Sequence, residues 1–178
     1  NGAHVAEVVI DPETGVVTLD RYTVVDDFGN LINPMLAEGQ VHGGVAQGIG
    51  QAVQERVVYD EDGQQLNTSM ADYLVPMAAE MPDIVVEHVE TPTKTSALGA
   101  KGAGEAGTAG APAAVMNAIN DALRPLGAQV TQMPFTPERI LRASEHPVLG
   151  SVEQRARRRS RVARLCRKRR AVQQSGGR

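Results

Sequence analysis

Cysteine is almost absent from this 178-residue sequence, which has Cys166 and no other. Disulfide frameworks, zinc knuckles and iron–sulfur ligation each need several sulfur atoms at short spacings, so this chain alone can build none of them. His4, His88 and His146 have no partner at ligand spacing, and we expect His42 to form structural hydrogen bonds rather than to bind a ligand. We therefore predict no direct metal ligand. Apolar runs as long as a membrane span or a signal peptide are also absent, which favours a soluble, cytoplasmic protein.

What is present is sufficient for one folded domain. A length of 178 residues with 42% apolar residues can bury a core. The first residue is Asn1 rather than Met, which is compatible with a piece of a longer polypeptide.

The net charge of -3 hides a division of the chain into two parts. Residues 1–150 hold 7 basic and 20 acidic side chains, whereas residues 151–178 hold 11 basic and 1 acidic. Because like charges repel, we predict that residues 145–178 form a disordered basic tail. Clustered arginines also suit nucleic-acid binding, but we favour a solvated tail or a translated sequence unrelated to the body.

The periodicity of residues 1–144 predicts an α+β body with antiparallel hairpins and two main helices. Residues 4–10 and 16–25 read as a hairpin, a second hairpin is expected around Asp62 and Gly63, and residues 84–90 read as a strand. One helix is expected over residues 39–56, with Pro34 closing the preceding loop. Val41, Val45, Ile49 and Val53 recur at spacings of four on one face of this helix, which we expect to be buried.

The second main helix and a last helix are predicted towards the end of this body. Pro112 suits the first turn of a helix that carries Ile119 and Leu123 on its apolar face. Thr136 is the expected N-cap of a last helix that begins at Pro137.

The helix over residues 39–56 is unusually rich in glycine. Its interior holds Gly43, Gly44, Gly48 and Gly50, and each costs about 0.8–1 kcal/mol relative to alanine. So many unfavourable residues indicate the close approach of another backbone or of a ligand.

Residues 102–107 read GAGEAG and match the G-x-G-x-x-G pattern of a dinucleotide-binding turn. A NAD-dependent oxidoreductase is therefore an alternative. The pattern does not directly follow the strand at 84–90, and a carboxylate at Glu105 would repel a pyrophosphate. Lys101 is not a P-loop lysine, since neither Ser nor Thr follows it.

Glu105 lies in a segment of small residues, GAKGAGEAG, that cannot build a core. Such surroundings leave room for a cofactor and a substrate beside the carboxylate. A poorly solvated carboxylate is also a stronger base, which suits proton abstraction.

Four stretches together carry a resemblance to a known family: residues 11–34, 39–52 (GQVHGGVAQGIGQA), 66–76 and 98–112 (LGAKGAGEAGTAGAP). In this order they resemble the C-terminal part of the molybdopterin-binding large subunit of the xanthine dehydrogenase, aldehyde oxidase and carbon monoxide dehydrogenase family. The resemblance covers residues 1–144, and the basic tail departs from it.

The resemblance implies that Glu105 is the catalytic base beside the molybdenum, deprotonating a hydroxyl ligand whose oxygen attacks an electron-poor carbon. It further implies that Gln40 lies close to the pterin, where a helix N-terminus could bind oxygen or phosphate groups. The segment formed by Lys101, Gly102, Ala103 and Gly104 would lie along a cofactor of the molybdopterin cytosine dinucleotide type.

The same resemblance implies partners that this chain lacks. Substrate-positioning loops belong to the remainder of the molybdenum subunit, and iron–sulfur and FAD centres belong to other subunits or domains. We therefore expect the isolated chain to be inactive as a hydroxylase. Aldehydes, N-heterocycles, purines and carbon monoxide all remain open as substrates. A non-catalytic module with a nucleic-acid-binding tail is the third hypothesis.

Overall fold

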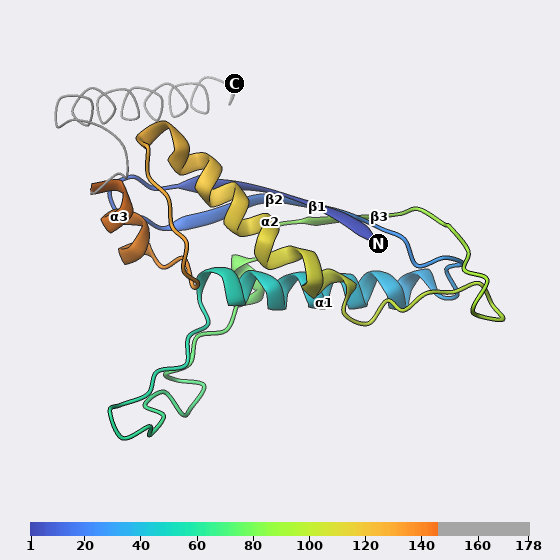
Figure 1. The fold of residues 1–178 in the computed structure, drawn as a ribbon, viewed down its shortest axis with the longest axis horizontal. Coiled ribbons are helices and arrows are strands. Elements are labelled where there is room, and N and C mark those ends of the chain that lie inside the picture. The colour runs from blue at the N-terminus through green and yellow to red at the C-terminus, as the bar shows by residue number, and fades with distance from the viewer. Residues whose placement is uncertain (146–178) are drawn as a thin grey trace.

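A computed structural model describes residues 1–145 of the chain, so the predicted basic tail lies outside the described residues apart from its first position. The described part consists of one three-stranded sheet with helices packed on one of its faces (Figure 1). The strands are β1 (Gly2–Ile10), β2 (Val17–Asp26) and β3 (Ile84–His88), in the spatial order β1-β2-β3. The α+β class predicted from the sequence is confirmed.

Strands β1 and β2 form the predicted antiparallel hairpin, in which Val5 pairs with Thr23. The turn between them is stabilised by Asp11, whose side chain accepts a hydrogen bond of 2.8 Å from the backbone N–H of Glu13. Strand β3 pairs with β2 in parallel, with Ile84 opposite Tyr22. The sheet is thus mixed rather than purely antiparallel, because a long crossover that includes a helix separates β2 from β3.

Helix α1 (Pro34–Val53) begins five residues before the predicted start at residue 39. Asn33 is its N-cap, and the side-chain oxygen of Asn33 accepts a hydrogen bond of 3.1 Å from the N–H of Leu36. Pro34 occupies the first helical position, where its missing N–H costs nothing. The Asn-Pro pair therefore starts the helix, so the loop ends at Pro34 as predicted but the helix follows at once rather than at residue 39.

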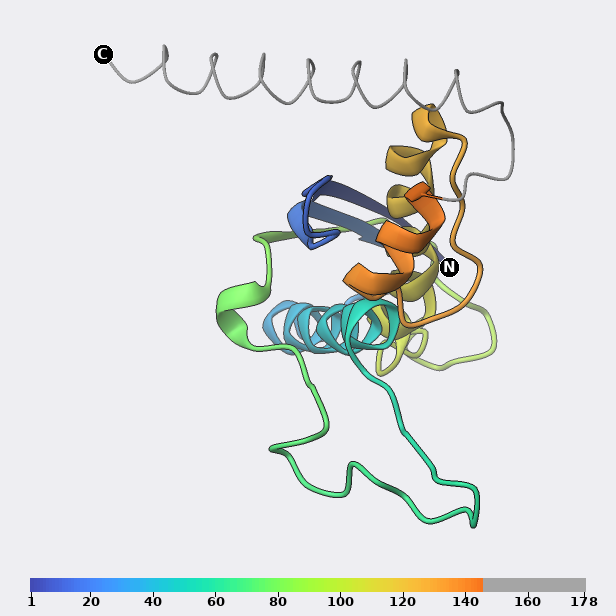
Figure 2. The same ribbon diagram turned by 90° about the vertical axis from the view of Figure 1, so that its left-hand side faces the viewer.

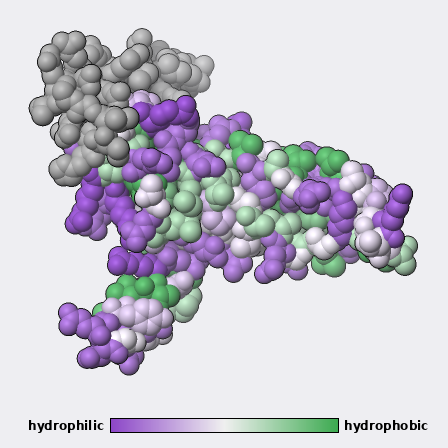
Figure 3. Space-filling view, in the orientation of Figure 1, coloured by the Kyte–Doolittle hydropathy of each residue, from purple (hydrophilic) through white to green (hydrophobic). Residues whose placement is uncertain are grey.

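The segment between α1 and β3 projects away from the body (Figures 1 and 2). The hairpin predicted around Asp62 and Gly63 is reduced to a single bridge between Tyr59 and Gln65. A short 3-10 helix, η1 (Ala78–Glu80), lies near the return to the sheet. Figure 3 shows hydrophobic surface on this projecting loop, which exposes Val57, Tyr59, Leu66, Met70, Leu74, Val75 and Met77.

Helix α2 (Ala106–Leu123) begins directly after Glu105, six residues before the predicted start. Pro112 therefore lies inside the helix rather than in its first turn. The chain then passes through a short 3-10 helix, η2 (Arg124–Leu126), to α3 (Pro137–Glu145). Thr136 caps α3 as predicted, because its hydroxyl accepts a hydrogen bond of 3.4 Å from the N–H of Arg139.

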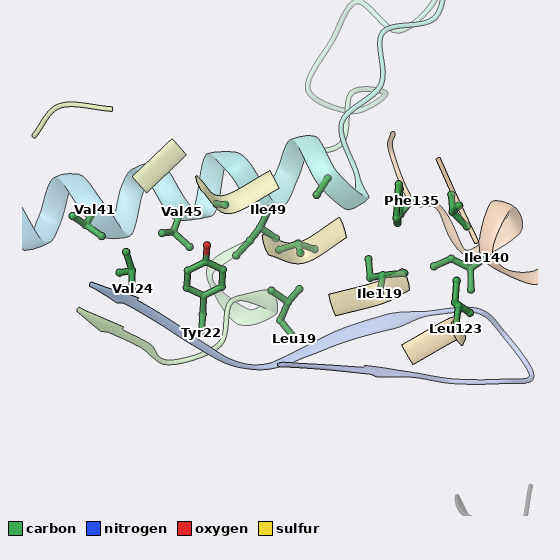
Figure 4. Packing of buried hydrophobic residues seen from close by; sticks show 14 of the residues in the cluster. Leu19, Tyr22, Val24, Val41, Val45, Ile49, Ile119, Leu123, Phe135 and Ile140 are labelled. Carbon is green, nitrogen blue, oxygen red and sulfur yellow. The ribbon is translucent and has the colours of Figure 1, made fainter. Parts of the chain in front are cut away.

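The core lies between the sheet and the helices (Figure 4). Tyr22 and Val24 point from β2 towards α1, and Ile119 points from α2 into the same cluster. The predicted apolar face of α1 is confirmed, since three of its members are fully buried: Val41, Val45 and Ile49. This core fixes the orientation of α1 and α2, and with it the position of the segment that precedes α2.

Candidate functional site

A cavity of about 280 Å³ opens where the start of α1 meets the segment before α2. Four of the six predicted site residues line it, namely Gln40, Lys101, Ala103 and Gly104. The lining is completed by Phe28, Asn30, Leu31, Ile32, Asn33, Leu36, Ala37 and Ala100. Gly102 and Glu105 adjoin lining residues in the chain but are not part of the lining.

The segment before α2 is attached to the loop that follows β2 by an isolated β-bridge between Gly29 and Ala100. Two backbone hydrogen bonds form this bridge. The N–H of Lys101 donates to the carbonyl of Phe28 at 2.7 Å, and the N–H of Asn30 donates to the carbonyl of Gly99 at 3.2 Å. Gly29 and Gly99 both have positive φ values, of 63° and 67°, which favour glycine at each position. Residues 99–101 therefore have a fixed position.

The start of α2 is fixed by close contact with α1. A Cβ atom added at Gly107 would lie 2.4 Å from the carbonyl oxygen of Val41, and one added at Gly44 would lie 2.8 Å from the backbone nitrogen of Thr108. The hydroxyl of Thr108 donates to the carbonyl of Gly44 at 3.1 Å. The glycine-rich pattern of α1 is thus explained in part by the approach of another backbone, as predicted.

Glu105 lies between these two fixed segments, at the N-cap position of α2. Its backbone carbonyl accepts a hydrogen bond of 3.1 Å from Ala109, but its side chain makes no capping hydrogen bond. The residue is exposed, and no hydrogen bond to its carboxylate is formed by the part of the chain that the structure describes. The position of the backbone is therefore set while the carboxylate remains available.

Gln40 lies inside α1 rather than at its N-terminus, because the helix begins at Pro34. The prediction that free backbone N–H groups at Gln40 bind oxygen or phosphate is therefore wrong. Gln40 is exposed and is one of the residues that line the cavity. No atom lies within 4 Å of a Cβ added at Gly39 or Gly43, so both neighbouring glycines are open.

Lys101 lines the cavity, but its ammonium group is bound elsewhere. The Nζ atom lies 2.5 Å from Oδ2 of Asp27 and 2.7 Å from Oγ1 of Thr91. The ammonium of Lys101 and hydrogen bonds from Thr91 and Gly29 hold the pKa of the Asp27 carboxyl well below its usual range. Lys101 therefore fastens the segment to the end of β2.

The stability of the described fold should depend on the charge of Asp27 at acid pH. Its pKa is lower in the folded chain than in the unfolded chain, where it is about 3.9. The stabilisation is present above that value and is lost as the pH falls towards the lower folded pKa. We expect a shallower loss of stability below pH 4 in Asp27→Asn, as measured by urea unfolding. If the wild type and Asp27→Asn lost stability equally steeply below pH 4, the contact between Asp27 and Lys101 would be contradicted.

Sequence reasoning missed two residues that shape this site. Asp27 was not singled out, because its partners Thr91 and Lys101 are distant in the chain. Asn33 was also missed, although an Asn directly before a Pro is a recognised start signal for a helix. By contrast, His42 has the structural role predicted for it, with Nε2 lying 3.2 Å from the carbonyl oxygen of Ile84.

The GAGEAG motif does not have the geometry of a dinucleotide-binding turn. Strand β3 ends at His88, well before Gly102, and the chain between them forms the loop attached to Phe28 and Asn30. In the dinucleotide fold the glycines directly connect a strand to a helix. This geometry disfavours the NAD-dependent alternative.

The chain is similar to subunits of known molybdenum enzymes. Residues 1–82 match the model of a molybdopterin cofactor-binding domain. The chain is 45% identical to the nicotine 6-hydroxylase large subunit of Paenarthrobacter nicotinovorans, over 82% of this chain and 18% of that protein. It is 38% identical to the carbon monoxide dehydrogenase large chain of Afipia carboxidovorans, over 81% of this chain and 18% of that protein.

Solved structures give the same result. The crystal structure of quinoline 2-oxidoreductase from Pseudomonas putida 86 superposes with a TM-score of 0.81 at 45% identity, over 83% of this chain and 19% of that one. The chain belongs to the xanthine dehydrogenase family of molybdopterin-binding subunits. It spans about a fifth of the length of the family members that it matches.

The residues that line the cavity are of types that suit a molybdopterin cofactor. Three of the residues that line it carry amide side chains: Asn30, Asn33 and Gln40. A Cβ added at Gly102 or Gly104 would meet no atom within 4 Å, so the backbone there is open to a close ligand. A cavity of about 280 Å³ is smaller than most ligand pockets. None of the helices formed by residues 1–145 is long and apolar enough to cross a membrane.

Proposed function

We propose that this chain forms part of a molybdenum hydroxylase-type oxidoreductase, to which it contributes the catalytic base and one wall of the cofactor site. The observation that carries this proposal is the placement of Glu105. Its backbone is held between the bridge at Ala100 and the helix contact at Gly107, while its carboxylate is exposed and has no partner among residues 1–145.

The chain would hold the cofactor through amide and backbone groups rather than through charge. The side chain of Gln40 would donate a hydrogen bond to the pterin ring or accept one from it. The backbone from Lys101 to Gly104 would run along it, with Ala103 packed against the core. The ammonium of Lys101 would stay on Asp27, so it would not reach a phosphate of the cofactor.

The bound molybdenum cofactor, proposed to be the cytosine dinucleotide form, would supply the two-electron oxidation and the oxygen transferred to the substrate. One carboxylate oxygen of Glu105 would take up the proton released in that step, acting as a general base. The electrons would leave through iron–sulfur and FAD centres on partner subunits or domains. Cys166 alone cannot ligate a cluster.

A nitrogen heterocycle is the substrate class that we propose for the complete enzyme. Nicotine and quinoline, named in the descriptions of two relatives that are each 45% identical to this chain, both contain a six-membered nitrogen heterocycle. The carbon next to a ring nitrogen is electron-poor, which suits attack by oxygen. The rest of the substrate site would belong to the remainder of the molybdenum subunit.

That remainder is the first partner that we propose. It has a surface to pack on, because the projecting loop exposes a set of large apolar side chains without a core of its own. The relatives are also named as large subunits or chains, or as one subunit of a complex.

The proposal is tested by isolating the tagged chain from its native host and assaying the complex with quinoline and an artificial electron acceptor. Formation of a hydroxylated product together with molybdenum in the complex would support the proposal. A complex that contains neither molybdenum nor hydroxylase activity towards quinoline, nicotine or an aldehyde would contradict it.

The role of Gln40 can be tested separately through cofactor retention. We expect Gln40→Ala to lower the molybdenum content per chain after gel filtration, because the cofactor loses an amide contact of about 1 kcal/mol. The matched control is Gln51→Ala, which removes an exposed glutamine from the last turns of the same helix. Equal molybdenum retention in the two variants would contradict a contact between Gln40 and the cofactor.

A further inference from the structure

Asp27 collects hydrogen bonds from three separate parts of the chain at the end of β2. Its Oδ1 accepts from the N–H of Gly29 at 2.9 Å and from the N–H of Thr91 at 3.1 Å. Its Oδ2 accepts from the hydroxyl of Thr91 and, at 2.5 Å, from the ammonium of Lys101. Thr91 Oγ1 in turn accepts from Lys101 at 2.7 Å. One carboxylate thus joins the loop after β2, the loop after β3 and the segment before α2.

The contacts of Asp27 lie at the last fixed point before Glu105. Residues 99–101 are bridged to the loop after β2. Between this anchor and α2, Ala103 packs against the core, while a Cβ added at Gly102 or Gly104 would meet no atom within 4 Å. Only three residues separate Lys101 from Glu105, the N-cap residue of α2. The anchor therefore sets where the chain enters the N-cap of α2.

We infer that Asp27 is a positioning residue, which sets the location of the Glu105 carboxylate through its ion pair with Lys101. This inference rests on the proposed function of Glu105 as the base and adds the residue that places it. Side-chain exposures of 11% for Asp27 and 27% for Lys101 shield the ion pair partly from water, so it is stronger than an exposed surface pair. Removing the charge of Asp27 releases the ammonium and loosens residues 99–101.

The test uses the complete molybdenum enzyme that contains this chain, with Asp27→Asn, Glu105→Gln and the double variant. A displacement of about 1 Å can lower a rate by roughly a hundredfold. We expect Asp27→Asn to lower kcat by about ten- to a hundredfold, with nearly unchanged KM and molybdenum content. Asp20→Asn, which changes an exposed carboxylate on β2, is the matched control and should leave kcat unchanged.

The double variant separates positioning from general damage. If Asp27 acts only through Glu105, adding Asp27→Asn to Glu105→Gln should not lower the residual rate of enzyme reduction any further. An equal fold-loss in both backgrounds, or a loss of molybdenum, would overturn the inference. A normal rate in Asp27→Asn beside an inactive Glu105→Gln would also overturn it, but would leave the proposed function standing. A normal rate in Glu105→Gln would overturn both.

A second variant covers the case in which Asp27→Asn does not fold. Lys101→Met removes the ammonium but keeps the backbone hydrogen bond from residue 101 to Phe28. It should give the same loss of kcat, and the amides of residues 99–101 should exchange hydrogen faster than in the wild type. Unchanged exchange and unchanged kcat in Lys101→Met would overturn the inference.

Discussion

Replacing Glu105 by Gln should almost abolish turnover of a nitrogen heterocycle by the assembled enzyme while the cofactor stays bound. The amide preserves the size of the side chain but cannot take up a proton at neutral pH. Removal of a general base typically lowers a rate by about 10²–10⁴-fold. The measurement is kcat with quinoline and an artificial electron acceptor, with molybdenum per chain determined on the same samples.

The control for this variant is Glu87→Gln, which neutralises an exposed carboxylate on β3. It should retain the activity of the wild type. A Glu105→Gln enzyme with normal turnover would contradict the role of Glu105 as the base. A loss of molybdenum along with activity would instead assign Glu105 to cofactor retention.

Adding one methyl group where α1 and α2 meet should cause the largest loss of stability. The Cβ of Gly107→Ala would lie 2.4 Å from the carbonyl oxygen of Val41, and that of Gly44→Ala would lie 3.0 Å from the Cα of Gly107. Backbone atoms cannot move aside as a flexible side chain can, so the helices must separate. We expect each variant to lower the free energy of unfolding by about 1–3 kcal/mol, measured by urea denaturation of the 178-residue chain.

Gly43→Ala is the matched control, since Gly43 lies directly beside Gly44 and a Cβ added there meets no atom within 4 Å. Alanine is favoured over glycine in a helix interior, so this variant should raise the free energy of unfolding by about 0.5–1 kcal/mol. A gain in the free energy of unfolding at Gly43 beside a loss at Gly44 would show that contact with α2 decides the effect of the added methyl group. If all three variants were stabilising, the close helix crossing would be wrong.

The hairpin and the apolar face of α1 could be predicted from the sequence because their signals are local. Alternation along β1 and β2 and the spacing of Val41, Val45 and Ile49 depend only on neighbouring residues. The cap at Thr136 is local for the same reason. In each case the sequence signal comes from residues within the element itself.

The helix starts were predicted less well. Glycine and proline near these starts lower the helix propensity of the sequence, but tertiary contacts make the residues helical all the same. The first turns of α2 are AGTAGA, a sequence with weak propensity that is held helical by packing of Gly107 and Ala111 against α1. The parallel pairing of β3 was also missed. The direction of β3 depends on the crossover through α1, and the residues of β3 do not themselves indicate whether the strand pairs in parallel.

The candidate site residues were chosen through resemblance, and their surroundings appear only in the fold. The sequence placed Lys101 and Glu105 together because they are neighbours in the chain. It could not show that the ammonium of Lys101 is bound by Asp27, 74 positions away. Nor could it show that Gln40 and Gly104 line the same cavity.

The most direct test of the central claim is the molybdenum content per chain, determined by elemental mass spectrometry on the tagged protein isolated gently from its native host. The claim that Glu105 and the surrounding cavity form one wall of a molybdenum cofactor site predicts close to one molybdenum per chain, carried in a complex with the remainder of the subunit. A complex that forms but contains no molybdenum would contradict it.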